Sequence, residues 1–80
     1  MRYFVEFSLL NFPAWSGGKD TKDSIISVGR VDDFNDLMDS LYQGQDNVSE
    51  TDVNDFLWFE RDFIARELGF KDFDDLLNCI

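Results

Sequence analysis

Residues 48–70 carry the strongest helical pattern of the chain. Ser49, followed three residues later by Asp52, resembles a capping box, in which a hydroxyl and a carboxylate satisfy the free amides at a helix start. Residues 56–59, FLWF, are four consecutive large apolar side chains, which is more than one helix stripe can hold. Either the helix is buried nearly all round or it kinks. We favour a break at residues 60–62, with a second helix after it.

The second helix has apolar residues at helical spacing over residues 63–68. Gly69 is the residue type that ends a helix in the left-handed conformation. Asp72 then caps a last short helix over residues 73–78. Its inward-facing residues are expected to be Phe73, Leu76 and Leu77.

Residues 32–42 form a single amphipathic pattern, with apolar side chains at i, i+3, i+4 and i+7 from Phe34. Asp32 or Asp33 is the expected cap. Gly44, in the polar loop that follows, is the expected stop. The solvent side carries Asp32, Asp36 and Asp39. We expect the core to combine both patterns through Leu37, Leu41, Phe56, Phe63, and Trp58 or Phe59.

The N-terminal part is less regular. Residues 2–10 are rich in aromatic and β-branched side chains and predict a strand. Residues 11–18 read as a link, and residues 20–29 fit either a helix capped by Asp20 or a strand, with helix favoured. Residues 24–31 could otherwise pair with the first strand. The predicted fold class is α+β: one mainly helical domain over residues 1–80, with an N-terminal strand followed by four or five short helices.

The net charge of the chain limits the classes of partner that it can bind. The 80 residues hold seventeen acidic and seven basic side chains, a net charge of −10, which repels nucleic acid and anionic membranes. Such a charge serves solubility or a partner with a basic surface. A membrane-spanning run and a secretion signal are both missing, and the single cysteine, Cys79, cannot form an internal disulfide. We therefore expect a cytoplasmic protein.

Candidate chemistry is sparse. Residues 16–21, SGGKDT, look like the phosphate-binding loop of ATP pyrophosphatases, but that fold is a parallel α/β sheet too large for this chain, so we interpret the match as chance. Residues 46–55 fail the EF-hand pattern. The chain has no histidine, which excludes a histidine triad and, with one cysteine, a zinc site. We expect no catalytic residues, no metal and no cofactor.

The carboxylates themselves remain as a candidate site. Side chains four apart on a helix stand about 6 Å apart, of the same order as the phosphates of a nucleic-acid strand, which rise by roughly 3.4 Å each. Two predicted helices present such rows. The candidate partner-binding residues are Asp32, Asp36, Asp39, Asp52 and Asp55. A merely solvated face is the alternative interpretation.

Several short sequence elements resemble those of proteins from mobile genetic elements. The elements WSG and DT (residues 15–17, 20 and 21), NDFLWFE (residues 54–60) and ELG (residues 67–69) resemble small acidic proteins of unknown function in phages, plasmids and conjugative elements of Gram-positive gut bacteria. The similarity spans about two thirds of the chain. It implies a mobile-element origin, transfers no catalytic residues, and favours helix for residues 20–28.

Two functions are predicted. The first is a non-enzymatic acidic inhibitor or modulator that mimics nucleic acid. Its partner would be a host defence nuclease or another protein with a basic, nucleic-acid-binding surface, as in anti-CRISPR-like proteins, and it would bind neither nucleic acid nor membrane itself. The alternative is a structural or regulatory interaction module that forms a homodimer through apolar surface, such as the edge of strand 2–10.

Overall fold

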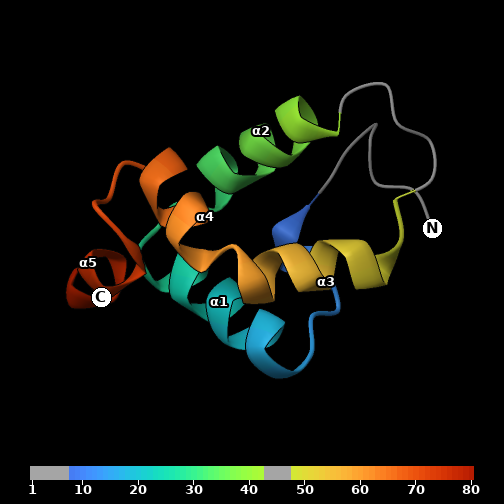
Figure 1. Ribbon diagram of the computed structural model, residues 1–80, viewed down its shortest axis with the longest axis horizontal. Helices are drawn as coiled ribbons and strands as arrows, with labels where there is room; N and C mark the ends of the chain where they lie inside the picture. The colour runs from blue at the N-terminus through green and yellow to red at the C-terminus, as the bar shows by residue number, and fades with distance from the viewer. Residues whose placement is uncertain (1–7, 43–47) are drawn as a thin grey trace.

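The computed structural model describes residues 8–42 and 48–80, and all regular structure in these residues is helical, with short connections (Figure 1). A short 3-10 helix comes first and five α-helices follow. Their bounds are η1 Leu9–Asn11, α1 Ser16–Ser27, α2 Val31–Leu41, α3 Glu50–Phe59, α4 Arg61–Glu67 and α5 Phe73–Asn78.

The prediction of an α+β fold is wrong, because the described residues contain no strand. The end of the expected strand 2–10 is the helix η1, and residues 2–7 lie outside the described part. The Leu9 amide donates to Asn35 Oδ1 at 2.9 Å and the Phe12 amide to the Leu9 carbonyl at 3.1 Å. These bonds satisfy the amides of Leu9 and Phe12 without a paired strand. Leu9 and Phe12 are both fully buried.

The preference for helix over residues 20–28 is confirmed, although α1 begins earlier, at Ser16. Residues 16–18, expected in the link, form its first turn. Gly29 ends the helix at a φ of +73°, and the Arg30 amide reaches back to the Ile25 carbonyl at 3.2 Å. This Schellman-type ending leaves residues 24–31 unavailable as a strand.

The helix ends around α3 and α4 agree with the predictions. Ser49 and Asp52 form a reciprocal capping box. The break falls at Glu60, whose φ of −110° and ψ of 35° end α3 and start α4. Gly69 has a φ of +98°, with the Phe70 amide bonded to the Ala65 carbonyl at 2.9 Å. Asp72 caps α5 through the Asp75 amide at 2.8 Å.

The cap predicted for α2 is wrong. Arg30 is the N-cap residue and makes no side-chain capping bond, while Asp32 and Asp33 lie in the first turn. Carboxylates there interact favourably with the positive end of the helix dipole without capping an amide. Gly44, the expected stop, lies outside the described residues.

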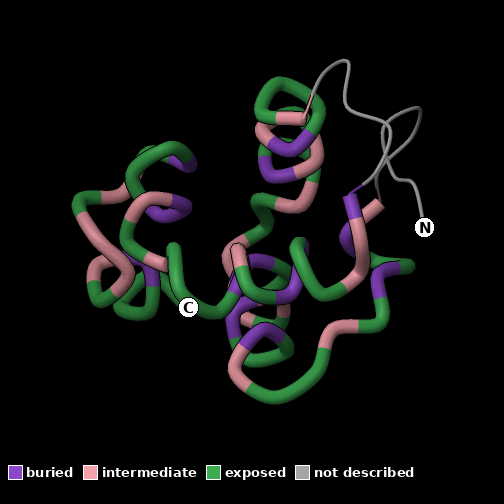
Figure 2. The backbone as a smooth tube through the Cα atoms, turned by 45° about the vertical axis from the view of Figure 1, so that its right-hand side comes forward, coloured by how far each residue is buried: buried purple, intermediate pink, exposed green. Residues whose placement is uncertain are grey.

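The core is mainly aliphatic and is built around the crossing of α1 and α3, the pair of elements with the most extensive contact (Figure 2). Gly18 lies where the backbone of α1 meets the Asn54 side chain of α3, and a Cβ there would collide with that side chain. The buried apolar residues are Leu9, Phe12, Ile25, Phe34, Met38, Val48, Val53, Leu57, Ile64, Ala65, Leu68 and Leu76.

The predicted core was therefore largely wrong. On α3 the buried face holds Val53, Asn54 and Leu57, so the next positions, Trp58 and Phe59, turn to solvent. Leu41 and Leu77 are also exposed. Two other expected core residues, Leu37 and Phe56, pack only partly against the buried cluster. Phe63 is half-buried, and its ring contacts that of Phe56. The chain uses its smaller aliphatic side chains where its helices cross and leaves much aromatic surface outside.

Candidate functional site

The carboxylates of α2 are exposed, as the helical pattern predicts. Asp32, Asp36 and Asp39 all face solvent, and none of them forms an ion pair within residues 8–42 and 48–80. Asp33 differs, since Arg30 Nη1 lies 3.2 Å from its Oδ2. The helix itself contains no lysine or arginine. Its solvent side is therefore a row of negative charge with no cation on the same helix.

The carboxylates of α3 are also exposed, but they differ in what they do. Asp52 accepts a hydrogen bond from the Ser49 amide at 3.2 Å in the capping box, so part of its hydrogen-bonding capacity serves the fold. Asp55 is exposed and has no such bond among the described residues. Helix α3 likewise contains no basic residue.

An aromatic layer joins α2 to α3. The Phe56 ring of α3 lies 6.4 Å from that of Phe34 and 6.5 Å from that of Tyr42, centroid to centroid. Burial raises the pKa of the Tyr42 hydroxyl, and the negative charge of Asp52 raises it further. The ring contact between Tyr42 and Phe56 places the end of α2 against α3. The two acidic helices thus belong to one packed unit.

Most cations of the described residues serve the fold. Lys19 pairs with Asp23 at 2.9 Å, and Lys22 donates to the Phe12 carbonyl at 2.7 Å. Arg61 Nε donates to Thr21 Oγ1 and its Nη2 to the Gly17 carbonyl, both at 2.9 Å. Few positive charges remain to balance the acidic surface.

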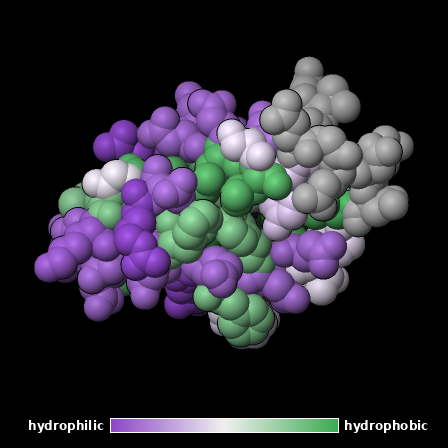
Figure 3. Space-filling view, turned by 45° about the horizontal axis from the view of Figure 1, so that its top comes forward, coloured by the Kyte–Doolittle hydropathy of each residue, from purple (hydrophilic) through white to green (hydrophobic). Residues whose placement is uncertain are grey.

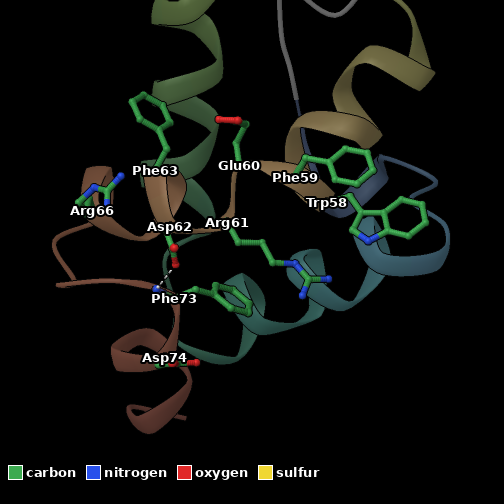
Figure 4. Close-up of a pocket in the computed structure, with 9 residues that line it drawn as sticks. All are labelled: Trp58, Phe59, Glu60, Arg61, Asp62, Phe63, Arg66, Phe73 and Asp74. Atoms are coloured by element: carbon green, nitrogen blue, oxygen red, sulfur yellow. Dashed lines mark hydrogen bonds between the residues drawn. The ribbon is translucent and has the colours of Figure 1, made fainter.

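A second feature lies at the junction of α3 and α4, where a pocket of about 430 Å³ opens beside two stacked rings (Figure 4). The Trp58 and Phe59 rings are 5.1 Å apart at 7°. Trp58 is 38% exposed and Phe59 is 68% exposed. The other residues that line the pocket are Glu60, Arg61, Asp62, Phe63, Arg66, Phe73 and Asp74.

The floor of this pocket is held by α4 and α5. The Arg61 guanidinium lies over the Phe73 ring, 5.3 Å from its centroid, and the Phe73 amide donates to Asp62 Oδ1 at 3.1 Å. Figure 3 shows apolar side chains reaching the surface between hydrophilic ones on one face of the molecule. The sequence interpretation placed Trp58 or Phe59 in the core. Four bulky residues in a row were the signal that at least one must lie outside.

The structure does not support a phosphate loop at residues 16–21. These residues form the first turns of α1, and Gly17 packs beneath the Trp58 ring, where a Cβ would collide. The Gly17 carbonyl accepts bonds from Thr21 and Arg61. The glycines therefore allow close helix packing. Within the described part of the chain no cluster of three metal-ligating side chains occurs.

Comparisons with protein-family models, curated proteins and solved structures gave no match for this chain. The resemblance to small proteins of mobile elements stays a prediction. Among the described helices, none is long and apolar enough to span a bilayer.

Proposed function

We propose that the protein is a non-enzymatic binding protein whose acidic helices occupy the basic, nucleic-acid-binding surface of another protein and thereby inhibit or modulate it. The observation that carries this proposal is that α2 and α3 contain no basic residue, while Asp36, Asp39 and Asp55 are exposed. A defence nuclease of a bacterial host is the partner class that the mobile-element resemblance favours.

Electrostatics supports a protein partner over nucleic acid. Rows of carboxylates attract a cationic cleft and repel phosphate, so they compete with DNA or RNA for the cleft. Because these side chains are exposed, salt screens their attraction to the partner at separations beyond the Debye length, which is about 8 Å at physiological ionic strength. Affinity for the partner should therefore fall steeply as salt is raised.

The test is affinity capture from a bacterial lysate at low and high salt, using the wild type and a variant with Asp36→Asn and Asp39→Asn. A matched control, Asp20→Asn with Glu67→Gln, removes the same charge from exposed positions on α1 and α4. We expect the wild type and the control to retain nucleic-acid-binding proteins at low salt and the α2 variant to lose them. Added DNA should displace the same proteins.

Two outcomes would contradict the proposal. In the first, the wild type retains no nucleic-acid-binding protein. In the second, the α2 variant and the matched control retain the same proteins equally at every salt concentration. Equal losses in both variants would mean that net charge alone, and not the α2 row, determines binding.

The exposed stack of Trp58 and Phe59 favours a second candidate, a homodimer formed through apolar surface. Apolar association survives high salt, in contrast to binding through carboxylates. Sedimentation at high protein concentration and high salt distinguishes the two. A monomer under those conditions excludes the homodimer.

A further inference from the structure

We propose that the outer face of the Trp58–Phe59 stack, together with the Glu60 carboxylate, binds an arginine side chain of the basic partner. This inference rests on the proposed function, because it takes a basic partner as given. It adds a defined contact at the junction of α3 and α4, separate from the row of carboxylates on α2.

The stack supplies a flat aromatic surface. Its two rings are nearly parallel, Trp58 is held against Gly17 of α1, and Phe59 covers Trp58 with most of its own surface in solvent. A large apolar residue this exposed gains little by folding, so its surface is open to a ligand. A planar guanidinium stacks on such a ring and is less strongly hydrated than an ammonium.

Charge selects a cation at this place. Glu60 follows Phe59 directly, is exposed, and forms no ion pair within the described ranges. The adjacent Arg61 has its guanidinium engaged by Thr21, Gly17 and the Phe73 ring. Arg66 lies on the opposite side of the pocket from Trp58 (Figure 4). Figure 4 shows the Glu60 carboxylate on the Phe63 side, pointing away from the stack. Because this side chain is exposed and has no ion pair among the described residues, it can turn toward a guanidinium that rests on Phe59.

Arginine is favoured over the other ligands of aromatic surfaces. A nucleobase would bring phosphates toward a protein of net charge −10. A lysine can pair with Glu60, but its compact ammonium offers no flat face to the ring. The pocket beside the stack, at about 430 Å³, has room for the chain that carries the arginine.

The test uses three blocked pentapeptides, Gly-Gly-Xaa-Gly-Gly, in which Xaa is arginine, lysine or citrulline. Each is titrated to millimolar concentration into ¹⁵N-labelled protein. Backbone amide shifts and the indole N–H signals of Trp15 and Trp58 report the binding site. The variants are Phe59→Ala and Glu60→Gln. Their controls are Ile80→Ala, another highly exposed apolar residue, and Glu67→Gln, an exposed carboxylate on α4.

The arginine peptide should shift the Trp58 indole and the amides of Phe59 and Glu60, leaving the Trp15 indole unchanged. Phe59→Ala and Glu60→Gln should each weaken binding about three- to tenfold, because each removes one exposed contact. Lysine should bind more weakly than arginine, and citrulline, which lacks the charge, more weakly still. Ile80→Ala and Glu67→Gln should bind like the wild type. All variants are checked for folding by circular dichroism.

Several results would overturn the inference. They are an absence of shifts at millimolar arginine peptide, shifts centred elsewhere, equal binding of lysine, or unchanged binding by Phe59→Ala. Shifts of the same signals on concentrating the protein alone would assign the surface to a second copy. The Asp36→Asn and Asp39→Asn variant should bind the arginine peptide normally. A failure of the α2 proposal therefore leaves the peptide result unchanged, and the reverse also holds.

Discussion

Replacing Gly18 by alanine tests the crossing of α1 and α3 by the sign of its effect. In an exposed helix this change stabilises by roughly 0.5–1 kcal/mol, because alanine loses less backbone entropy than glycine. Here the added Cβ would lie 2.7 Å from Cγ of Asn54, which is fully buried. Asn54 cannot move without disturbing the bond that its Oδ1 accepts from the Trp15 amide at 3.0 Å.

The expected magnitude follows from these contacts. Overpacking a filled interface costs about 1–3 kcal/mol, and a weakened bond to a part-buried amide costs about 1–3 kcal/mol. Adding these two costs and subtracting the helix gain, we expect Gly18→Ala to destabilise by about 1–5 kcal/mol, with the middle of that range at about 3 kcal/mol. For a domain of this size, a loss of about 3 kcal/mol lowers the thermal midpoint by roughly 12–24 °C. Urea and thermal unfolding, followed by circular dichroism, measure both quantities.

A double-mutant cycle identifies the clash. In an Asn54→Ala background the space beside residue 18 is vacant, so Gly18→Ala should become nearly neutral, with a coupling of about 3 kcal/mol. Gly17→Ala is the neighbouring control. It meets the ring of Trp58, which is partly exposed and can turn away, so it should cost less than about 1 kcal/mol. A thermal midpoint that rises on Gly18→Ala would refute the close crossing.

Three further predictions concern other contacts. Phe56→Ala should destabilise by about 2–3 kcal/mol, since its half-buried ring contacts three others, whereas Phe59→Ala should stay within about 0.5 kcal/mol; equal midpoints would contradict the assigned burial. Arg61→Ala should lower the free energy of unfolding in denaturant by about 1–3 kcal/mol, and Arg61→Lys should restore only part of that loss, because the guanidinium makes two bonds to α1. Full rescue by lysine would argue against both bonds being needed. Burial and the charge of Asp52 raise the pKa of Tyr42, so the folded protein keeps a proton that the unfolded chain loses near pH 10. The stability that this group contributes is complete below that pH and is lost as the pH rises through the folded pKa. The free energy of unfolding should therefore fall more for the wild type than for Tyr42→Phe between about pH 9 and 11.

The helix ends could be predicted because their chemistry is local. The caps at Ser49 and Asp72 satisfy backbone amides three residues away, and Gly69 ends its helix through its own positive φ. Such bonds depend little on the rest of the fold, so a pattern of four to six residues is enough to identify them. The break at Glu60 follows from the same kind of reasoning, since no helix can turn four large residues toward one core.

The N-terminal strand could not be judged in this way. Strand propensity measures how well side chains fit a partly buried sheet. It does not predict the structure of a segment whose backbone groups find hydrogen-bond partners outside a sheet. The amide of Leu9 finds its acceptor in Asn35, 26 residues away. No local pattern around residues 8–11 indicates that bond. Which face of α3 is buried also depends on a distant residue. Because Gly18 has no side chain, Asn54 can be buried against α1, and Trp58 and Phe59 then remain partly in solvent.

The candidate site divides along the same line. Exposure of Asp32, Asp36 and Asp39 follows from the single apolar stripe of α2 and is confirmed, although their role in binding stays a prediction. The pocket beside Phe59 was missed, because it exists only where α4 and α5 meet through Arg61 and Phe73. A sequence lists those residues without showing that they lie together.

The two proposed contacts respond differently to salt, and this difference follows from where the fold places each kind of side chain. Screening acts on the long-range attraction of the α2 row, which governs the rate of encounter and weakens as ions are added. An arginine that rests on Phe59 also gains dispersion and apolar contact, which salt leaves largely intact. A partner that used both would therefore bind with a salt-sensitive association rate and a less sensitive dissociation rate, so that Asp36→Asn slows its arrival and Phe59→Ala hastens its release.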